Sequence, residues 1–327
     1  MPAPKKRFHM TSDVLCLRPE EDFLRVGVVP PAGLAIAYRA LDDADVPELI
    51  RNVRALVIPA VGPPLDAALF EASKVELVQV TGAGIDRLDQ PALKRLDIAI
   101  ANVSGGSNGA VAEYVLSAAL ALMRRLVWAD HEIRAGNYAD FRSRMVNDRL
   151  SGLDGATVGV IGLGTIGGAV AKAFHGMGAR IIFHDPAPLD PDAAAAMGAE
   201  AHVLPRLLET ADVVTLHVPL VAATEGLIGD AELRLMKPDA VLINAARGGV
   251  VDEAALAAAL GDGRLAGAAV DVYVNEPPDA SNPLLALTGE AARRVLFTPH
   301  IAGVSRQAWA RLFRVAWDNV ERVLSQR

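Results

Sequence analysis

The sequence is poor in several features that mark particular classes of protein. Its 327 residues include one cysteine, Cys16, which excludes an internal disulfide and a cysteine-based zinc site. The run that comes nearest to a membrane-spanning segment, 110–123, is too short to cross a membrane and contains Glu113. A formal charge of −7 disfavours nucleic acid or an anionic membrane as the main partner. No His, Cys or carboxylate cluster has metal-ligand spacing, so we expect no metal.

The remaining composition is typical of a globular protein. Hydrophobic residues make up 52% and charged residues 22% of a chain that is long enough for two domains. Residues 1–10 are basic, but no apolar core follows them as a signal peptide requires. We therefore expect a cytoplasmic protein and interpret 1–10 as a ragged start or an expression remnant. Cys16 lies in the apolar run 14–17, which favours a buried structural thiol.

A glycine-rich turn is the clearest motif in the chain. The apolar run 158–161 is followed by Gly162, Gly164 and Gly167 in a GxGxxG pattern, and then by the helical run 169–177. The first glycine permits a tight turn, the second lets the backbone approach a pyrophosphate, and the third lets helix and strand pack closely. The start of the helix also offers free N–H groups. The pattern predicts a dinucleotide site, although a plain turn in an α/β sheet is the alternative.

A carboxylate follows the next predicted strand and would lie at this site. The run 180–183 ends just before Asp185, about 20 residues beyond the glycines, where an acidic side chain binds the ribose hydroxyls of a dinucleotide. A carboxylate there repels a 2′-phosphate, and no arginine immediately follows to receive one. The sequence therefore predicts NAD in preference to NADP.

Short apolar runs alternate with helical segments along the rest of the chain. Such alternation predicts parallel sheets covered by helices, because parallel strands need crossover connections. The expected strands of a first α/β domain are 14–17, 35–38, 55–58, 75–80 and 98–102, with helices at 46–53 and 65–73. Beyond the glycine turn, we expect strands at 212–217, 240–245, 268–272 and 295–297, with helices at 205–210, 230–236 and 252–260.

Two long helices and a polar stretch complete the predicted organisation. The helix expected at 109–128, capped by Ser107 or Asn108, marks the crossing between domains. The final helix, 305–324, lies beyond the last strand and is free to pack on the first domain. The polar stretch 136–155 is either a solvated connection or a flap that reaches the active site.

Three polar side chains follow strands of the second predicted domain. Arg247, Glu276 and His300 each come just past a buried run and beside Gly or Pro. Ligands of doubly wound sheets bind outside the carboxyl ends of the strands, so these residues are candidates for the chemistry. A cation, a carboxylate and an imidazole suit the reduction of a 2-oxo acid by a nicotinamide.

Each of these side chains has a role in that reaction. His300 can protonate the carbonyl oxygen, since an imidazole titrates near ~6.5. Glu276 would orient its ring, and Arg247 would bind the substrate carboxylate through its planar fork. Taken singly, each residue also has a structural explanation. Arg247 could cap a strand end, Glu276 could form a surface ion pair, and His300 could be a hydrogen-bonded loop residue.

Several ordered motifs together resemble the D-isomer-specific 2-hydroxyacid dehydrogenase family, in particular its glyoxylate and hydroxypyruvate reductases. The resemblance covers nearly the whole chain and is carried by residues 81–86, 102–114, 158–168, 217–219, 244–248, 271–273 and 298–303. It implies two Rossmann-like, doubly wound parallel-sheet domains with the active site in the cleft between them. The flavodoxin-like substrate domain would comprise 1–104 and 304–327, and the NAD-binding Rossmann domain 105–303.

The family also implies roles for individual residues. Arg247, Glu276 and His300 would be catalytic, and Arg247 and His300 would bind substrate together with the backbone N–H groups of Gly82, Ala83 and Gly84. Asp271 would hold the nicotinamide carboxamide. The implied cofactor-binding residues are Gly162, Gly164, Thr165, Ile166, Gly167, Asp185, His217, Val218, Pro219, Ala245, Ala246, Arg247, Asp271, His300 and Gly303. A homodimer formed through the cofactor domain is also implied, and the regulatory domain of some phosphoglycerate dehydrogenases is expected to be absent.

The substrate stays open among several alternatives. The loop 59–64 has no polar side chain for a phosphate, so glyoxylate and hydroxypyruvate lead. Arg306, or Arg142 or Arg144 from the polar stretch, could face a second anionic group. A different class of function is an NAD(H)-sensing protein similar to the family's corepressors. A third possibility is a dehydrogenase of another donor, such as phosphite or formate.

Overall fold

The computed structural model describes residues 12–148, 150–187 and 191–326, and its chain forms two compact units. The first unit comprises the described residues up to Ser107 and those from Ser305 onward; the second is Asn108–Val304. The interpretation of residues 1–10 lies outside the described residues. No helix in the described ranges is long and apolar enough to cross a membrane.

The first unit is built on a five-stranded sheet in which neighbouring strands are parallel. The strand order is β2-β1-β3-β4-β5, the order of flavodoxin-like doubly wound sheets. The strands are β1 (Val14–Cys16), β2 (Ile36–Tyr38), β3 (Ala55–Ile58), β4 (Leu77–Val80) and β5 (Ala99–Ala101). Cys16 in β1 is a buried, unpaired thiol, as predicted, and its burial raises its pKa to about 12.

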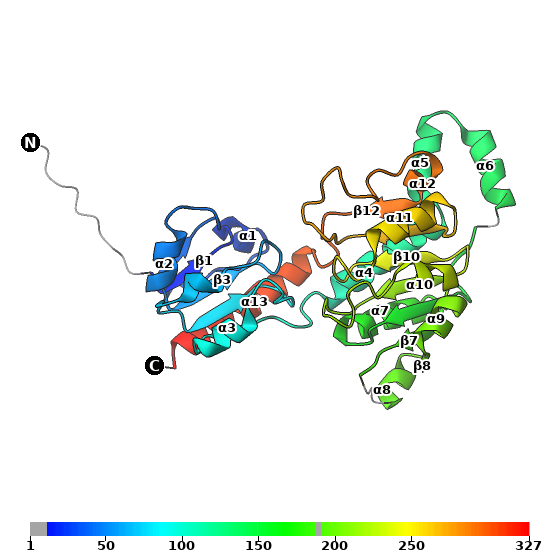
Figure 1. Ribbon diagram of the computed structural model, residues 1–327. Coiled ribbons are helices and arrows are strands. Elements are labelled where there is room, and N and C mark those ends of the chain that lie inside the picture. The colour runs from blue at the N-terminus through cyan, green and yellow to red at the C-terminus, as the bar shows by residue number, and fades with distance from the viewer. Residues whose placement is uncertain (1–11, 149, 188–190, 327) are drawn as a thin grey trace, which may run out of the picture. The chain divides into compact units, whose positions relative to one another are not determined.

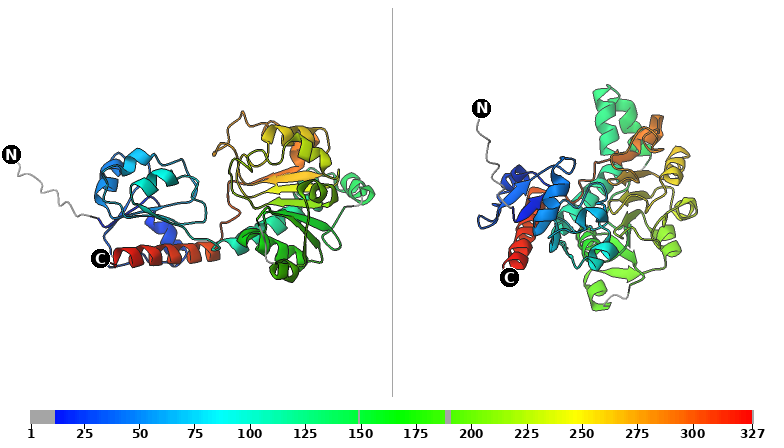
Figure 2. Two further views of the ribbon diagram at one scale, coloured as in Figure 1. Left: turned by 60° about the horizontal axis from the view of Figure 1, so that its bottom comes forward. Right: turned by 60° about the vertical axis from the view of Figure 1, so that its left-hand side comes forward.

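Helices cover both faces of this sheet. On one face, α1 (Glu20–Arg25) and the C-terminal α13 (Arg306–Leu324) share a core, in which the Phe23 ring lies 4.6 Å from Phe313 and 5.3 Å from Trp317. The opposite face packs on α2 (Val46–Asn52) and α3 (Gln90–Arg95). Figures 1 and 2 show α13, in red, lying along the blue and cyan elements of this unit. The last helix of the chain thus completes the core of the first unit.

The second unit has a seven-stranded parallel sheet in the order β12-β11-β10-β9-β6-β7-β8. This is the order of a dinucleotide-binding Rossmann sheet with one more strand, and the order reverses between β6 and β9. The two doubly wound sheets confirm the predicted fold class. The strands are β6 (Thr157–Ile161), β7 (Arg180–His184), β8 (Ala199–Ala201), β9 (Val213–Leu216), β10 (Val241–Asn244), β11 (Gly267–Val270) and β12 (Val295–Phe297).

Both faces of this sheet are also buried, which explains the continuous apolar runs of its strands. Val158 and Val160 of β6 join the core beneath α4 (Asn108–Met123) and α7 (Thr165–His175). Ile161 joins the opposite core, beneath α9 (Leu204–Thr210), α10 (Asp230–Leu235) and α11 (Glu253–Gly261). Helices α8 (Pro191–Ala196) and α12 (Gly289–Arg293) complete the unit.

Two predictions for residues 109–155 differ from the structure. The helix expected at 109–128 ends at Met123, because Arg125 adopts a left-handed φ of 51° and α5 (Leu126–Arg134) starts anew. The polar stretch 136–155 contains α6 (Tyr138–Asn147), whose single buried side chain, Phe141, packs on Trp128. One buried residue gives too weak an amphipathic pattern to predict a helix. Helices α5 and α6 form an arm, residues 126–147, that projects from the second unit (Figure 1).

Other differences concern short elements. The helix expected at 65–73 is only a 3₁₀ turn, η1 (Ala67–Phe70), which Asp66 caps by accepting a hydrogen bond from the Ala68 N–H. The sequence analysis missed the short helices α1, α3, α8 and α12, and the edge strand β8. These elements have three to six residues, too few to show a clear periodicity.

Replacing Phe23 by Ala tests the packing of α13 on the first unit. The fully buried ring contacts two aromatic rings of α13, so we expect Phe23→Ala to lower the free energy of unfolding by about 3–5 kcal/mol. The matched control is Leu24→Ala, since the neighbouring side chain is 51% exposed and its loss should cost less than about 0.5 kcal/mol. Urea denaturation measures both. Equal effects of the two substitutions would contradict this packing.

Candidate active site

The glycine turn lies at the carboxyl end of β6, where the strand order of the second sheet reverses. Gly162 has a φ of 87°, and a Cβ there would lie 2.6 Å from the His217 carbonyl oxygen. A Cβ on Gly167 would lie 2.0 Å from the Gly162 carbonyl oxygen. Because neither approach leaves room for a methyl group, both positions require glycine.

Gly164 has a different environment. It is the N-cap of α7, and a Cβ built on it would meet no described atom within 4 Å. The helix therefore begins, at Thr165 and Ile166, with N–H groups beside open space. This open backbone fits a bound pyrophosphate, whose negative charge the helix N-terminus would stabilise.

Asp185 lies against the same turn. One oxygen of its carboxylate accepts a hydrogen bond from the Leu163 N–H at 2.8 Å, and the other accepts one from the Ala187 N–H at 2.9 Å. Each oxygen keeps a further lone pair, and the side chain is partly exposed. The carboxylate is therefore fixed beside the glycines with acceptor capacity left for a pair of hydroxyls.

The end of β9 forms the other side of this reversal point. Val218 is so close to the glycine turn that a Cβ on Gly162 would meet its side chain at 2.8 Å. Burial lowers the pKa of His217 to about 3, so the ring is neutral, and its Nε2 lies 3.0 Å from the Thr215 hydroxyl. Pro219 follows and is exposed. The predicted adenosine-binding segment 217–219 thus borders the turn.

The segment that carries Arg247 is held by a buried amide. The Asn244 side chain accepts a hydrogen bond from the Ala246 N–H and donates one to the Arg247 carbonyl oxygen, both at 3.1 Å. Ala245 lies between them. The Arg247 guanidinium donates to the Ala246 carbonyl oxygen at 2.6 Å, and its charge acts on Glu276. The turn after β10 therefore places the positive charge of Arg247 where it helps to lower the pKa of Glu276.

Glu276 and His300 are in direct contact. The Nδ1 atom of His300 lies 2.8 Å from one carboxylate oxygen of Glu276, and the Tyr273 N–H donates to the other at 3.1 Å. Burial raises the pKa of Glu276, but hydrogen bonds from His300 and Tyr273, with the charges of His300 and Arg247, outweigh it and leave the pKa below its usual value. Glu276 is thus ionised at neutral pH. The three candidate catalytic residues form one electrostatic group.

Asp271 faces the loop that carries His300. Its side chain is fully buried, and the carboxylate accepts hydrogen bonds from the Ile301 and Ala302 N–H groups and from the Thr298 hydroxyl. The contact expected between Asp271 and a nicotinamide carboxamide therefore stays a prediction. Gly303, partly exposed, ends this loop.

The predicted carboxylate-binding turn lies in the first unit, after β4. The Gly82 carbonyl oxygen accepts a hydrogen bond from the Val103 N–H at 2.9 Å, and the Asn102 amide donates to the Ala83 carbonyl oxygen at 2.6 Å. Ala83 and Gly84 are partly exposed. The turn is thus fixed through its carbonyl groups, and the binding of an anion by its N–H groups stays a prediction.

Arg87 is a residue that the sequence analysis missed. It is 7% exposed, and its guanidinium donates to the carbonyl oxygens of Pro59, Val61 and Pro63 at 2.8–3.2 Å. Burial lowers its pKa. A buried cation thus shapes the loop 59–64 next to the Gly82 turn, and its place directly after the motif 81–86 was the available signal.

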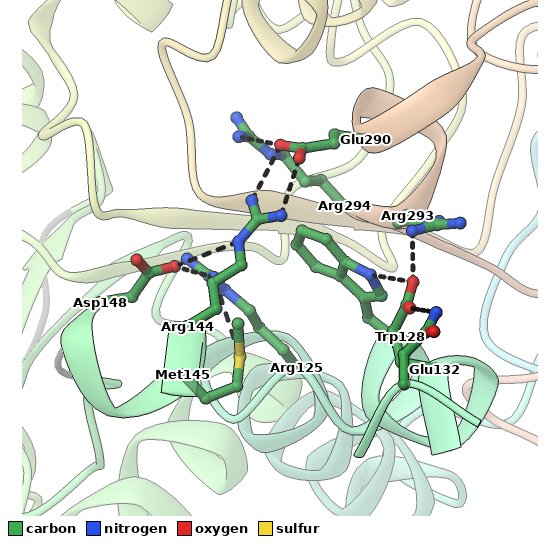
Figure 3. Close-up of polar contacts among 10 residues, drawn as sticks. Arg125, Trp128, Glu132, Arg144, Met145, Asp148, Glu290, Arg293 and Arg294 are labelled. Carbon is green, nitrogen blue, oxygen red and sulfur yellow. Dashed lines mark hydrogen bonds and ion pairs between the residues drawn. The ribbon is translucent and has the colours of Figure 1, made fainter. Parts of the chain in front are cut away.

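The arginines considered for a second anion have different surroundings. Arg144 forms a two-fold hydrogen bond with Glu290 of α12 at 2.8 and 3.0 Å and lies 4.6 Å from the Trp128 ring centre (Figure 3). Arg125 and Arg293 approach the same ring. Arg144 therefore ties the arm to the second unit, which disfavours a role in substrate binding. Arg142 and Arg306 are exposed.

Comparisons with known proteins agree with this geometry. Residues 116–302 match the model of the "D-isomer specific 2-hydroxyacid dehydrogenase, NAD binding domain" family. The chain belongs to this family. Its cofactor is accordingly NAD, as the glycine turn and Asp185 predicted. Within the described residues, no group of three or more His, Cys, Asp or Glu side chains could hold a metal ion.

Individual relatives of this chain have different names. It is 39% identical over 246 residues to (S)-sulfolactate dehydrogenase from Chromohalobacter salexigens, covering 75% of this chain and 76% of the relative. It is 35% identical over 254 residues to glyoxylate reductase from Aeropyrum pernix, covering 77% and 74%. It is 37% identical over 265 residues to D-3-phosphoglycerate dehydrogenase from Archaeoglobus fulgidus, covering 80% of this chain but only 48% of that longer protein.

A solved structure shows the same fold. The holo form of D-mandelate dehydrogenase from Rhodotorula graminis is 27% identical, with a TM-score of 0.81 over 95% of this chain and 94% of that one. The family and fold are therefore shown, whereas the relatives' different names leave this chain's own substrate open.

Replacing Gly164 by Ala separates folding from cofactor binding. Because a Cβ at this position meets open space, we expect Gly164→Ala to keep the thermal unfolding temperature within about 2 °C, while NADH binding weakens at least about tenfold. Gly261→Ala, at the end of α11, is the control that should change neither property. Fluorescence titration with NADH measures the affinity. Unchanged affinity for the Gly164 variant would place the pyrophosphate elsewhere.

Proposed function

We propose that this dehydrogenase reduces a small 2-oxo acid to the D-2-hydroxy acid, with glyoxylate or hydroxypyruvate as the substrate. The observation that carries the proposal is the 2.8 Å contact between His300 and Glu276, beside the charge of Arg247. It pairs a proton donor with a carboxylate that stays ionised and with a cation suited to the substrate carboxylate.

In this mechanism NAD supplies the hydride when bound in its reduced form. Glu276 occupies the Nδ1 side of the His300 ring, so Nε2 is the nitrogen that faces outward and gives its proton to the substrate carbonyl oxygen. The ionised Glu276 stabilises the protonated ring before transfer and fixes its orientation. Arg247 binds the substrate carboxylate, and the Gly82–Gly84 turn supplies N–H donors to the same group.

A loop of the first unit favours a small substrate over one with a charged tail. The loop 59–64 presents Val61, 43% exposed, and has no polar side chain, while the carbonyl oxygens of Pro59, Val61 and Pro63 point to Arg87. A loop of this chemistry offers little to a phosphate or sulfonate. The relatives named glyoxylate reductase agree with the proposal, whereas the relative named (S)-sulfolactate dehydrogenase makes a charged tail the competing substrate class.

A panel of oxo acids tests the proposal. We expect NADH oxidation at neutral pH with glyoxylate or hydroxypyruvate to exceed that with pyruvate, 2-oxoglutarate, sulfopyruvate or phosphonooxypyruvate, and NADPH to be the poorer cofactor. His300→Gln should lower kcat at least about 100-fold, with NADH affinity within about threefold of wild type. The matched control is His175→Gln, on the exposed end of α7.

The outcomes of this panel are distinct. If turnover is fastest with sulfopyruvate, the substrate is an oxo acid with a charged tail, and the proposed mechanism is unchanged. Retained activity in His300→Gln would remove the proposed acid. Tight NADH binding without turnover on any oxo acid would favour a sensing role, and NAD reduction by phosphite or formate would favour another donor.

We also propose that the protein is a cytoplasmic homodimer. The support is the arm, which exposes the apolar side chains of Leu126, Val127, Tyr138 and Val146 by 55–64%. Covering such side chains with a second copy removes apolar surface from water. Light scattering at micromolar concentration should give twice the chain mass, and Val127→Glu with Val146→Glu should give the monomer. A wild-type monomer would contradict the proposal.

A further inference from the structure

A chain of hydrogen bonds leads from helix α4 to the backbone of His300. The Tyr114 hydroxyl on α4 lies 2.6 Å from the Thr298 hydroxyl, and Thr298 donates to Asp271 at 2.6 Å. The same Asp271 oxygen accepts the Ile301 N–H at 2.8 Å, and its other oxygen accepts the Ala302 N–H at 2.9 Å. Three segments that are distant in sequence, α4, the end of β11 and the loop 298–302, are thus linked through one buried carboxylate.

The direction of these hydrogen bonds is fixed by their chemistry. A carboxylate only accepts, so the single proton of the Thr298 hydroxyl goes to Asp271. Tyr114 must then be the donor to Thr298. Burial raises the pKa of Tyr114 to about 12, which keeps this donor protonated at neutral pH. The relay therefore has one polarity, from Tyr114 through Thr298 to Asp271.

The relay ends on three consecutive backbone N–H groups. Besides the two that its side chain binds, the Asp271 carbonyl oxygen accepts the His300 N–H at 2.7 Å. His300 itself has a φ of 53°, in the left-handed region that a residue with a side chain rarely adopts. A strained conformation persists only where its surroundings hold it, and here Asp271 binds the strained residue and the two that follow.

We infer that Tyr114, Thr298 and Asp271 are positioning residues that hold His300 in its left-handed conformation and thereby set its ring against Glu276. None of the three needs to touch the substrate. This inference rests on the proposed function, since it concerns the acid of that reaction. The charged groups that face the ring are Glu276 directly and Arg247 through Glu276.

Valine at position 298 tests the relay, because it keeps the shape of threonine and removes the hydroxyl. We expect Thr298→Val to lower kcat about tenfold or more while the KM for NADH stays within about twofold. Thr298→Ser restores the donor and should return kcat to near wild type.

A second variant tests the relay with a smaller change in structure, in case Thr298→Val fails to fold. Tyr114→Phe removes only the outer donor, so we expect a smaller decrease in kcat, about two- to fivefold. Unchanged kcat in Thr298→Val would overturn the inference. So would equal losses in the valine and serine variants, since these would indicate a packing effect.

A measurement without turnover separates this inference from the proposed function. In protein labelled at the histidine ring nitrogens, NMR records the chemical shift of His300 Nδ1, assigned by its loss in His300→Gln. We expect this chemical shift to change in Thr298→Val, because a displaced ring loses its contact with Glu276, and to return in Thr298→Ser. If the wild type reduces no oxo acid, the proposed function fails, and this chemical shift alone decides the relay. An unchanged chemical shift in Thr298→Val would overturn it.

Discussion

Parallel pairing of the strands is the constraint on which the rest of the structure depends. Because every strand of the seven-stranded sheet runs in the same direction, the segments that leave the carboxyl ends all start from one edge. Six strands each deliver one functional candidate to this edge. In chain order these are Gly162, Asp185, His217, Arg247, Asp271 and His300. The sheet thus gathers residues from almost the whole length of the unit.

The sequence predicted those features that have a local pattern. Strands buried on both faces are continuous apolar runs, and the glycine turn requires particular residues at fixed spacing, so both were identifiable. The pairing of His300 with Glu276 was also predicted, because both follow strands near each other in the chain. Short helices were missed, since α6 buries only Phe141.

The polar residues that hold the active-site loops in place have no such local pattern. Tyr114 and Thr298 are 184 positions apart, and nothing near either of them indicates the other. Only the fold brings them together. Arg87 shows the same difficulty, because its partners are backbone carbonyl groups of residues 59–63 and not side chains that a sequence motif would display.

Two buried residues of opposite charge, Asp271 and Arg87, each hold one loop of this protein in place. In the second unit, the Asp271 carboxylate gathers N–H and O–H donors around itself; in the first unit, the Arg87 guanidinium gathers carbonyl acceptors. Both groups are buried, and a buried polar group that is well hydrogen-bonded restricts a loop to one conformation. Apolar packing alone does not specify the direction of a backbone N–H or carbonyl group.

The isolated Cys16 has a practical consequence. It is fully buried in β1, and its raised pKa keeps the thiol protonated, so it reacts slowly with maleimides and similar reagents. A single cysteine introduced on the surface would be the one reactive thiol, without first removing the natural one.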